Sequence, residues 1–148
     1  MATWSEFAAA APEMAADGRR LLYARGDGEG LLATVRGEAP PRIHPINVGI
    51  VDGQLYAFLL RSAKRADLEQ DGRYALHAHQ DPAHPDEFSV RGRARIIEDA
   101  AVRSAVGGSW FFAVDESYYL FEFLIESAVL GLRGADEWPP RYSRWPAT

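Results

Sequence analysis

Short apolar runs, separated by turns that contain glycine and proline, make up most of the chain. This pattern predicts a mainly β protein with short helices. Six runs have the length and composition of strands: residues 31–35, 42–51, 54–60, 73–80, 88–96 and 118–132. Asp52-Gly53, between the second and third runs, favours a type I′ turn that joins those two strands in a hairpin. Mainly antiparallel strands in a chain of this length indicate a small closed barrel.

Local capping signals predict four short helices around these strands. Thr3 and Glu6 have the spacing of a capping box, in which each side chain bonds the backbone N–H of the other residue. Proline suits a first helical turn, so a second helix is expected at residues 12–22. Serine and aspartate N-caps begin two more helices, and glycines end them; the expected ranges are 62–71 and 99–106. The last residues, 134–148, are expected to be irregular but packed.

Two of the predicted strands have unusual surfaces. Residues 54–60 are apolar on both faces, whereas a strand with one solvated face alternates, so the second face needs a helix, a cofactor or another subunit as a cover. Pro45 has no N–H to donate, which places residues 42–51 at a sheet edge or makes that strand irregular. Because large exposed apolar faces are rare on monomers, we expect a homodimer.

Composition narrows the functional classes. The length of 148 residues suits one domain, here residues 1–148. A net charge of −5 argues against a general nucleic-acid binder, and no apolar run is long enough to span a membrane. The chain has no cysteine, and acidic residues interrupt the N-terminal alanine run, so we predict no disulfide and no signal peptide. These features favour a cytoplasmic protein.

The most informative chemistry lies at residues 61–68, where a predicted helix begins. Ser62 is a good N-cap, but Lys64 and Arg65 follow in the first turn, and Arg61 precedes it. Cations at a helix N-terminus are disfavoured by roughly 0.3–1 kcal/mol each. A bound phosphate would reverse this effect, because it would meet free backbone N–H groups, a hydroxyl and the basic side chains. The alternative is a solvated basic turn, which is the commoner use of such residues.

The order of these segments resembles the flavin-binding split-barrel family related to pyridoxamine 5′-phosphate oxidase. The matching segments are residues 32–36, 41–45, 52–53, 62–64, 67–68, 73–76 and 90–94. The resemblance implies a six-stranded antiparallel split β-barrel that forms a dimer, with FMN in a groove between the subunits. The true oxidases carry a C-terminal motif with arginine and histidine that holds pyridoxal phosphate. This chain lacks that motif, so the resemblance does not imply vitamin B6 oxidation.

The resemblance also implies where FMN would bind. Ser62 and Lys64 match the family residues that hold the phosphate, and Arg65 and Arg42 are candidates for further phosphate contacts. Two strand segments would line the flavin, namely Arg42, Ile43, His44, Pro45, Ile46 and Asn47, and then Phe58, Leu59 and Leu60. His44 could contact the ring or the phosphate, or cover the groove rim.

Other residue groups leave alternatives open. His77, His79 and His84 do not have the spacing of a known zinc site, so we predict a polar strand face and no metal site. Residues 110–112 would belong to the core or an interface, or form a substrate wall. The tail around Trp138, Arg141 and Trp145 could close over the groove.

Two functional hypotheses remain, and the sequence does not separate them. The first is an FMN-dependent oxidoreductase of unknown substrate, for which no catalytic residue can be named. The second is a non-catalytic protein that binds a flavin, the deazaflavin F420 or haem on the same barrel.

Overall fold

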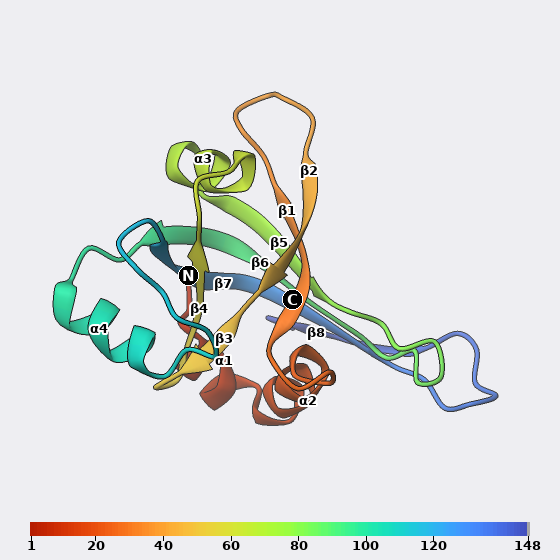
Figure 1. Ribbon diagram of the computed structural model, residues 1–148. Helices are drawn as coiled ribbons and strands as arrows, with labels where there is room; N and C mark the ends of the chain where they lie inside the picture. The colour runs from red at the N-terminus through yellow and green to blue at the C-terminus, as the bar shows by residue number, and fades with distance from the viewer. Residues whose placement is uncertain (148) are drawn as a thin grey trace.

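The computed structural model describes residues 1–147 and is mainly β, as the sequence predicts. Four helices and eight strands are present in this part of the chain (Figure 1). They follow in the order α1 (Trp4–Ala10), α2 (Pro12–Leu22), β1 (Glu29–Thr34), β2 (Arg42–Asn47), β3 (Gly49–Val51), β4 (Gln54–Leu59), α3 (Ala63–Gln70), β5 (Arg73–Ala78), β6 (Glu87–Ile96), α4 (Ala100–Gly108), β7 (Tyr119–Leu132) and β8 (Arg141–Trp145).

All strand pairs are antiparallel, and they form one curled sheet in the order β2-β1-β5-β6-β7-β4-β3. β8 pairs with the second half of β7. β2 and β3 stand at the two ends of this order, and they follow one another in the chain. The curled sheet is a half-barrel, and the backbone between these two strands connects its ends. The join is at Val48, whose N–H donates to the Gly28 carbonyl at 3.0 Å.

The predicted count of six strands is wrong, for two physical reasons. The strand expected at residues 42–51 is divided at Val48, because its first half pairs with β1 and its second half pairs with β4. The tail was expected to be irregular, but residues 141–145 form β8 against the edge of β7 that β4 leaves open. The prediction that Pro45 belongs to an edge strand is confirmed, because β2 stands at the end of the sheet.

The capping signals gave the helices nearly as expected. The capping box at Thr3 is present, and α2 has the predicted bounds. Ser62 caps α3 by accepting from the Arg65 N–H at 3.3 Å. Asp52 and Gly53 have φ values of 50° and 76°, as a type I′ turn requires. One expectation was wrong: α4 continues through Gly107 and Gly108, and does not end before them.

The hydrophobic core fills the inside of the curled sheet, and helices close its two ends. α1 and α2 lie at one end, where the Phe7 ring stacks on Phe88 with centroids 6.4 Å apart. α3 lies at the other end and buries Leu68 (Figure 1). Trp145 packs on Phe7 at 5.1 Å and so lies against this core. The sequence allowed it to close over the cofactor groove, but it does not line the groove between β2 and β4.

A second, smaller core lies on the outer face of β4. Tyr56 and Phe58 pack there against Val106 and Trp110, and the Phe58 and Trp110 rings meet edge to face at 5.1 Å. α4 is therefore the cover that the doubly apolar strand needs. Of the three covers expected for this face, a helix, a cofactor or another subunit, the structure supplies the helix.

Two connections lie side by side and project from the body as an arm (Figure 1). They join β5 to β6 and β7 to β8, and the Asp86 carboxylate links them by accepting from the Arg133 N–H at 2.9 Å. Trp138 lies on this arm and is 76% exposed. None of the helices in residues 1–147 is long and apolar enough to cross a membrane.

Candidate functional site

A groove of about 420 Å³ opens where β2 separates from β4. β3 stays paired with β4 as far as the Gly49–Tyr56 pair, but β2 turns away to pair with β1. The edge of β2 therefore faces the end of β4 across a gap. Eight of the twelve residues expected to bind a cofactor line this groove, namely Pro45, Ile46, Asn47, Phe58, Leu59, Leu60, Ser62 and Lys64.

The start of α3 forms the basic end of the groove. The Ser62 hydroxyl accepts from the Arg65 N–H and donates to the Leu60 carbonyl at 3.1 Å, so it is oriented on both sides. The Lys64 ammonium group donates to the Pro45 carbonyl at 3.3 Å, and so reaches from α3 to β2. An ammonium group has three donors, so further donors remain for an anion at this end. The first turn of α3 contains no acidic residue that would neutralise Lys64.

Arg65 points away from the groove. Its guanidinium donates to the carbonyls of Leu59 and Ser117 at 3.3 and 3.0 Å, and it pairs with Glu69 at 3.1 Å. It also lies over the Tyr119 ring, 3.7 Å from the centroid. With its side chain only 12% exposed, Arg65 fastens α3 to the start of β7. The structure therefore does not bring Arg65 to the groove with Ser62 and Lys64.

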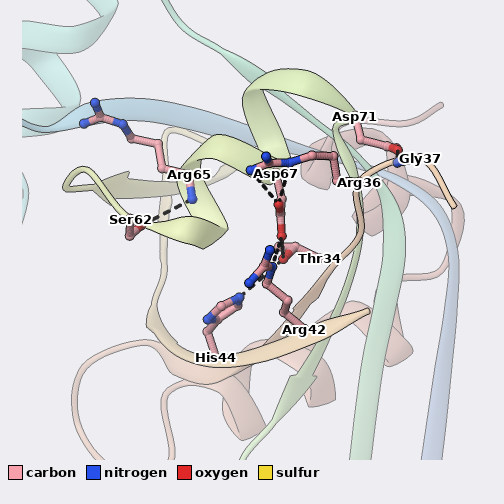
Figure 2. A network of polar contacts seen from close by, with 9 residues as sticks. All are labelled: Thr34, Arg36, Gly37, Arg42, His44, Ser62, Arg65, Asp67 and Asp71. Atoms are coloured by element: carbon pink, nitrogen blue, oxygen red, sulfur yellow. Dashed lines mark hydrogen bonds and ion pairs between the residues drawn. The ribbon is translucent and has the colours of Figure 1, made fainter. Parts of the chain in front are cut away.

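Three other expected residues, Arg42, Ile43 and His44, form the first half of β2 and lie beside the groove without lining it. Ile43 points outward and is 71% exposed. Arg42 and His44 point toward α3 (Figure 2). The Arg42 guanidinium pairs with the buried Asp67 carboxylate at 3.2 Å, and the His44 ring contacts the Thr34 hydroxyl at 3.4 Å. Arg42 would have to leave Asp67 before it could contact a phosphate.

The far end of the groove is polar. Asn47 pairs with Glu29 across β2 and β1, and the next pair, Gly30–Ala78, brings His79 to the same end. Asn47, Glu29 and His79 all line the groove. The sequence analysis missed Glu29 and His79 as groove residues, because only the register between β1 and β5 brings them there. In residues 1–147, no group of three acidic or histidine side chains is arranged to hold a metal ion.

Aromatic side chains form the wall opposite β2. Phe112 and Tyr118 come from the segment between α4 and β7, and their ring centroids are 5.6 Å apart. Phe58, which is 5% exposed, forms part of the floor. The alternatives expected for residues 110–112 therefore apply to different residues: Trp110 belongs to the core, and Phe112 forms part of the groove wall. A planar ring fits such a site, because flat apolar faces stack on aromatic side chains.

Comparison with known proteins supports the fold. No protein-family model matches the chain, and no curated protein matches its sequence. Solved structures do match. One is a protein from Clostridium acetobutylicum related to general stress protein 26, of the pyridoxinephosphate oxidase family, with a TM-score of 0.65 and 13% identity over 88% of this chain and 92% of that chain. Another is a putative pyridoxamine 5′-phosphate oxidase from Listeria innocua, with a TM-score of 0.59 and 18% identity over 74% and 91%.

A haem-binding protein from Mycobacterium smegmatis also matches, with a TM-score of 0.61 and 14% identity. The match covers 86% of this chain and 57% of that protein, so the chain spans little more than half of its length. These structural neighbours confirm the resemblance at the level of the fold, which is the split barrel. Identities this low show the fold alone, so the activity and the ligand have to be inferred from the site.

Proposed function

We propose that the protein binds FMN in the groove between β2 and β4 and acts as an FMN-dependent oxidoreductase. One observation carries the proposal: a single groove joins a basic helix start to flat apolar and aromatic walls. FMN has the complementary form, with a phosphate at one end and a planar ring at the other. The volume of about 420 Å³ lies within the usual range for small-molecule sites.

The residues that line the groove also suit FMN in their chemistry. Ser62 and Lys64 would hold the phosphate, while residues 45–47 and 58–60 would flank the ring, as expected from the sequence. When bound, FMN would supply the redox chemistry. The part of this chain is then to orient the cofactor, to exclude water with the walls at Phe112 and Tyr118, and to balance the phosphate charge with Lys64.

The proposed partner is a second copy of the chain. Ile43 lies on the same outward side of β2 as Pro45 and Asn47, because these positions are two residues apart. Leu31 and Ala75 continue this exposed apolar surface on β1 and β5. A subunit seated there would cover the apolar face and border the groove. The proposed assembly is therefore a homodimer with the cofactor beside the interface.

The absorbance spectrum of the purified protein tests the cofactor assignment. We expect a flavin spectrum, either as isolated or after addition of FMN, and tighter binding of FMN than of riboflavin, which lacks the phosphate. Turnover that depends on a reductant would then identify an oxidoreductase rather than a flavin carrier. Protein that binds neither flavin would contradict the proposal.

Haem is the second candidate, and one observation favours it. His79 lines the groove, and histidine is the proximal ligand of haem iron in globins and peroxidases. One structural neighbour is named as a haem-binding protein. The same spectrum separates the two candidates, because haem gives a Soret band and FMN does not. A Soret band that appears with haemin, in protein that does not bind FMN, would favour haem.

A further inference from the structure

His44 lies at the end of a hydrogen-bonded chain that begins at a buried carboxylate (Figure 2). The Asp67 side chain is 1% exposed and accepts from the Thr34 hydroxyl at 2.8 Å. Arg36 and Arg42 pair with the same carboxylate at 3.0 and 3.2 Å. The two guanidinium groups balance the charge of this carboxylate, as a buried charge requires.

This arrangement fixes which nitrogen of the His44 ring carries the hydrogen. An ionised carboxylate only accepts, so the single hydroxyl hydrogen of Thr34 goes to Asp67. Toward His44, the Thr34 oxygen can therefore only accept, and the hydrogen in this long contact of 3.4 Å must be on Nε2. Nδ1 is then the basic nitrogen of the ring. Within residues 1–147, Nδ1 makes no hydrogen bond to the protein.

His44 is also next to the basic end of the groove. Lys64 donates to the backbone carbonyl of Pro45, the residue that follows His44, so the ammonium group lies beside the part of β2 that carries His44. In the empty protein, partial burial and the nearby charges of Lys64 and Arg42 lower the pKa of His44, and Asp67 opposes them in part. An anion beside Lys64 would reverse the balance of charge around the ring.

We propose that His44 is a proton-linked part of the anion site. Its Nδ1 takes up one proton from solvent when a phosphate monoester binds beside Lys64, so the affinity for that phosphate rises as the pH falls. The inference rests on the proposed FMN site and adds regulation by pH to it. Thr34 and Asp67 act as positioning residues, because they hold Nε2 in its protonated state and leave Nδ1 to take up the proton.

The experiment is a fluorescence titration of the full chain with FMN and with riboflavin between pH 8.5 and pH 6.5. In the wild type, we expect the affinity for FMN to rise by about three- to tenfold as the pH falls, relative to His44→Gln. The FMN phosphate itself titrates with a pKa near 6. This effect is the same for both proteins, so it cancels when the affinity of the wild type is divided by that of His44→Gln. The affinity for riboflavin should show the same pH dependence in both proteins. His84→Gln is the matched control, because His84 is exposed on the arm, away from the groove and from the proposed interface.

A second measurement uses the wild type alone, so it does not depend on whether a variant folds. NMR titration of the wild type should give a higher pKa for His44 with FMN bound than without it. If FMN binds better than riboflavin but its pH dependence and the pKa of His44 are unchanged, the inference is overturned and the FMN site stands. If FMN and riboflavin bind equally, or neither binds, the phosphate site itself is wrong and the inference falls with it.

Discussion

Lys64 is the residue on which the proposed phosphate site depends most. It is the one lysine or arginine among the residues that line the groove in the described part of the chain, and it lies in the first turn of α3. A cation there is unfavourable in the empty protein and becomes favourable when a dianion docks. Each charge-assisted hydrogen bond to such an anion contributes roughly 1.5–3 kcal/mol.

We therefore expect Lys64→Ala to weaken FMN binding by about ten- to a hundredfold and to leave riboflavin binding nearly unchanged. Stability should change little, because loss of the hydrogen bond to Pro45 offsets removal of a cation from the helix start. Flavin fluorescence quenching measures both ligands. Arg61→Ala is the matched control, since Arg61 is an exposed cation outside the groove. Equal weakening of FMN and riboflavin by Lys64→Ala would leave a solvated basic turn as the better account.

At this scale, the sequence predicted local chemistry better than the directions of side chains. Ser62 and Lys64 could be found because capping and first-turn charge depend on neighbours in the chain. Arg65 could not be placed, because the Ser117 carbonyl that holds it lies far along the chain. Arg42 was uncertain for the same reason, since its partner Asp67 comes from α3. Among these three basic residues, tertiary partners decide which one lines the groove.

Among the elements, α3 is held in place by aspartates at two of its turns. Asp67 connects the helix to β1 through Thr34 and to β2 through Arg42. Asp71, at the C-terminal end, accepts from the Gly37 N–H at 2.8 Å and pairs with Arg73 at 2.6 Å. The Arg73 guanidinium and then the Gly37 N–H hold the pKa of the Asp71 carboxyl well below its usual range. This contact fastens the β1–β2 turn to the helix.

A depressed pKa in the folded state means that the ionised carboxylate stabilises the protein at pH values above its unfolded pKa, which is about 4. The contribution is lost as the pH falls through the lower, folded value. We expect Asp71→Asn to lower the thermal midpoint at pH 7 by a few degrees, and to flatten its decline below pH 4. Thermal unfolding between pH 7 and pH 2 checks this. Asp17→Asn, in an exposed ion pair with Arg20, should change little. An unchanged acid profile in Asp71→Asn would contradict the prediction.

The sequence predicted most elements, because turns and caps depend on residues close in the chain. It failed where pairing between distant strands decides the structure. Residues 42–51 read as one strand, yet the groove exists because this strand divides at Val48 and changes its partner. β8 was missed because its short sequence, residues 141–145, has no apolar alternation and is ordered by the edge of β7. The polar end of the groove was missed likewise, since Glu29 and His79 meet through strand register.

At the scale of the whole molecule, helices of the chain cover several apolar surfaces of the sheet. α1, α2 and α3 close the barrel ends, and α4 covers the outer face of β4. The outer face of β2, β1 and β5 differs, because Ile43 and Leu31 are 71% and 41% exposed there, and the exposed Ala75 continues this face on β5. Exposed apolar residues gathered on one sheet face are typical of an interface. This face borders the groove, so assembly and ligand binding are expected to be linked.

We therefore expect Ile43→Lys to shift a dimer toward monomer, because an isologous contact would place the two new charges in one interface. Light scattering at micromolar concentration measures the mass, and FMN affinity should fall with it if the partner borders the groove. Ile96→Lys is the matched control, since Ile96 is 40% exposed on β6 outside this face, and it should leave both quantities unchanged. A wild type of monomeric mass would refute the dimer, and a monomeric variant with full FMN affinity would show that one subunit forms the site.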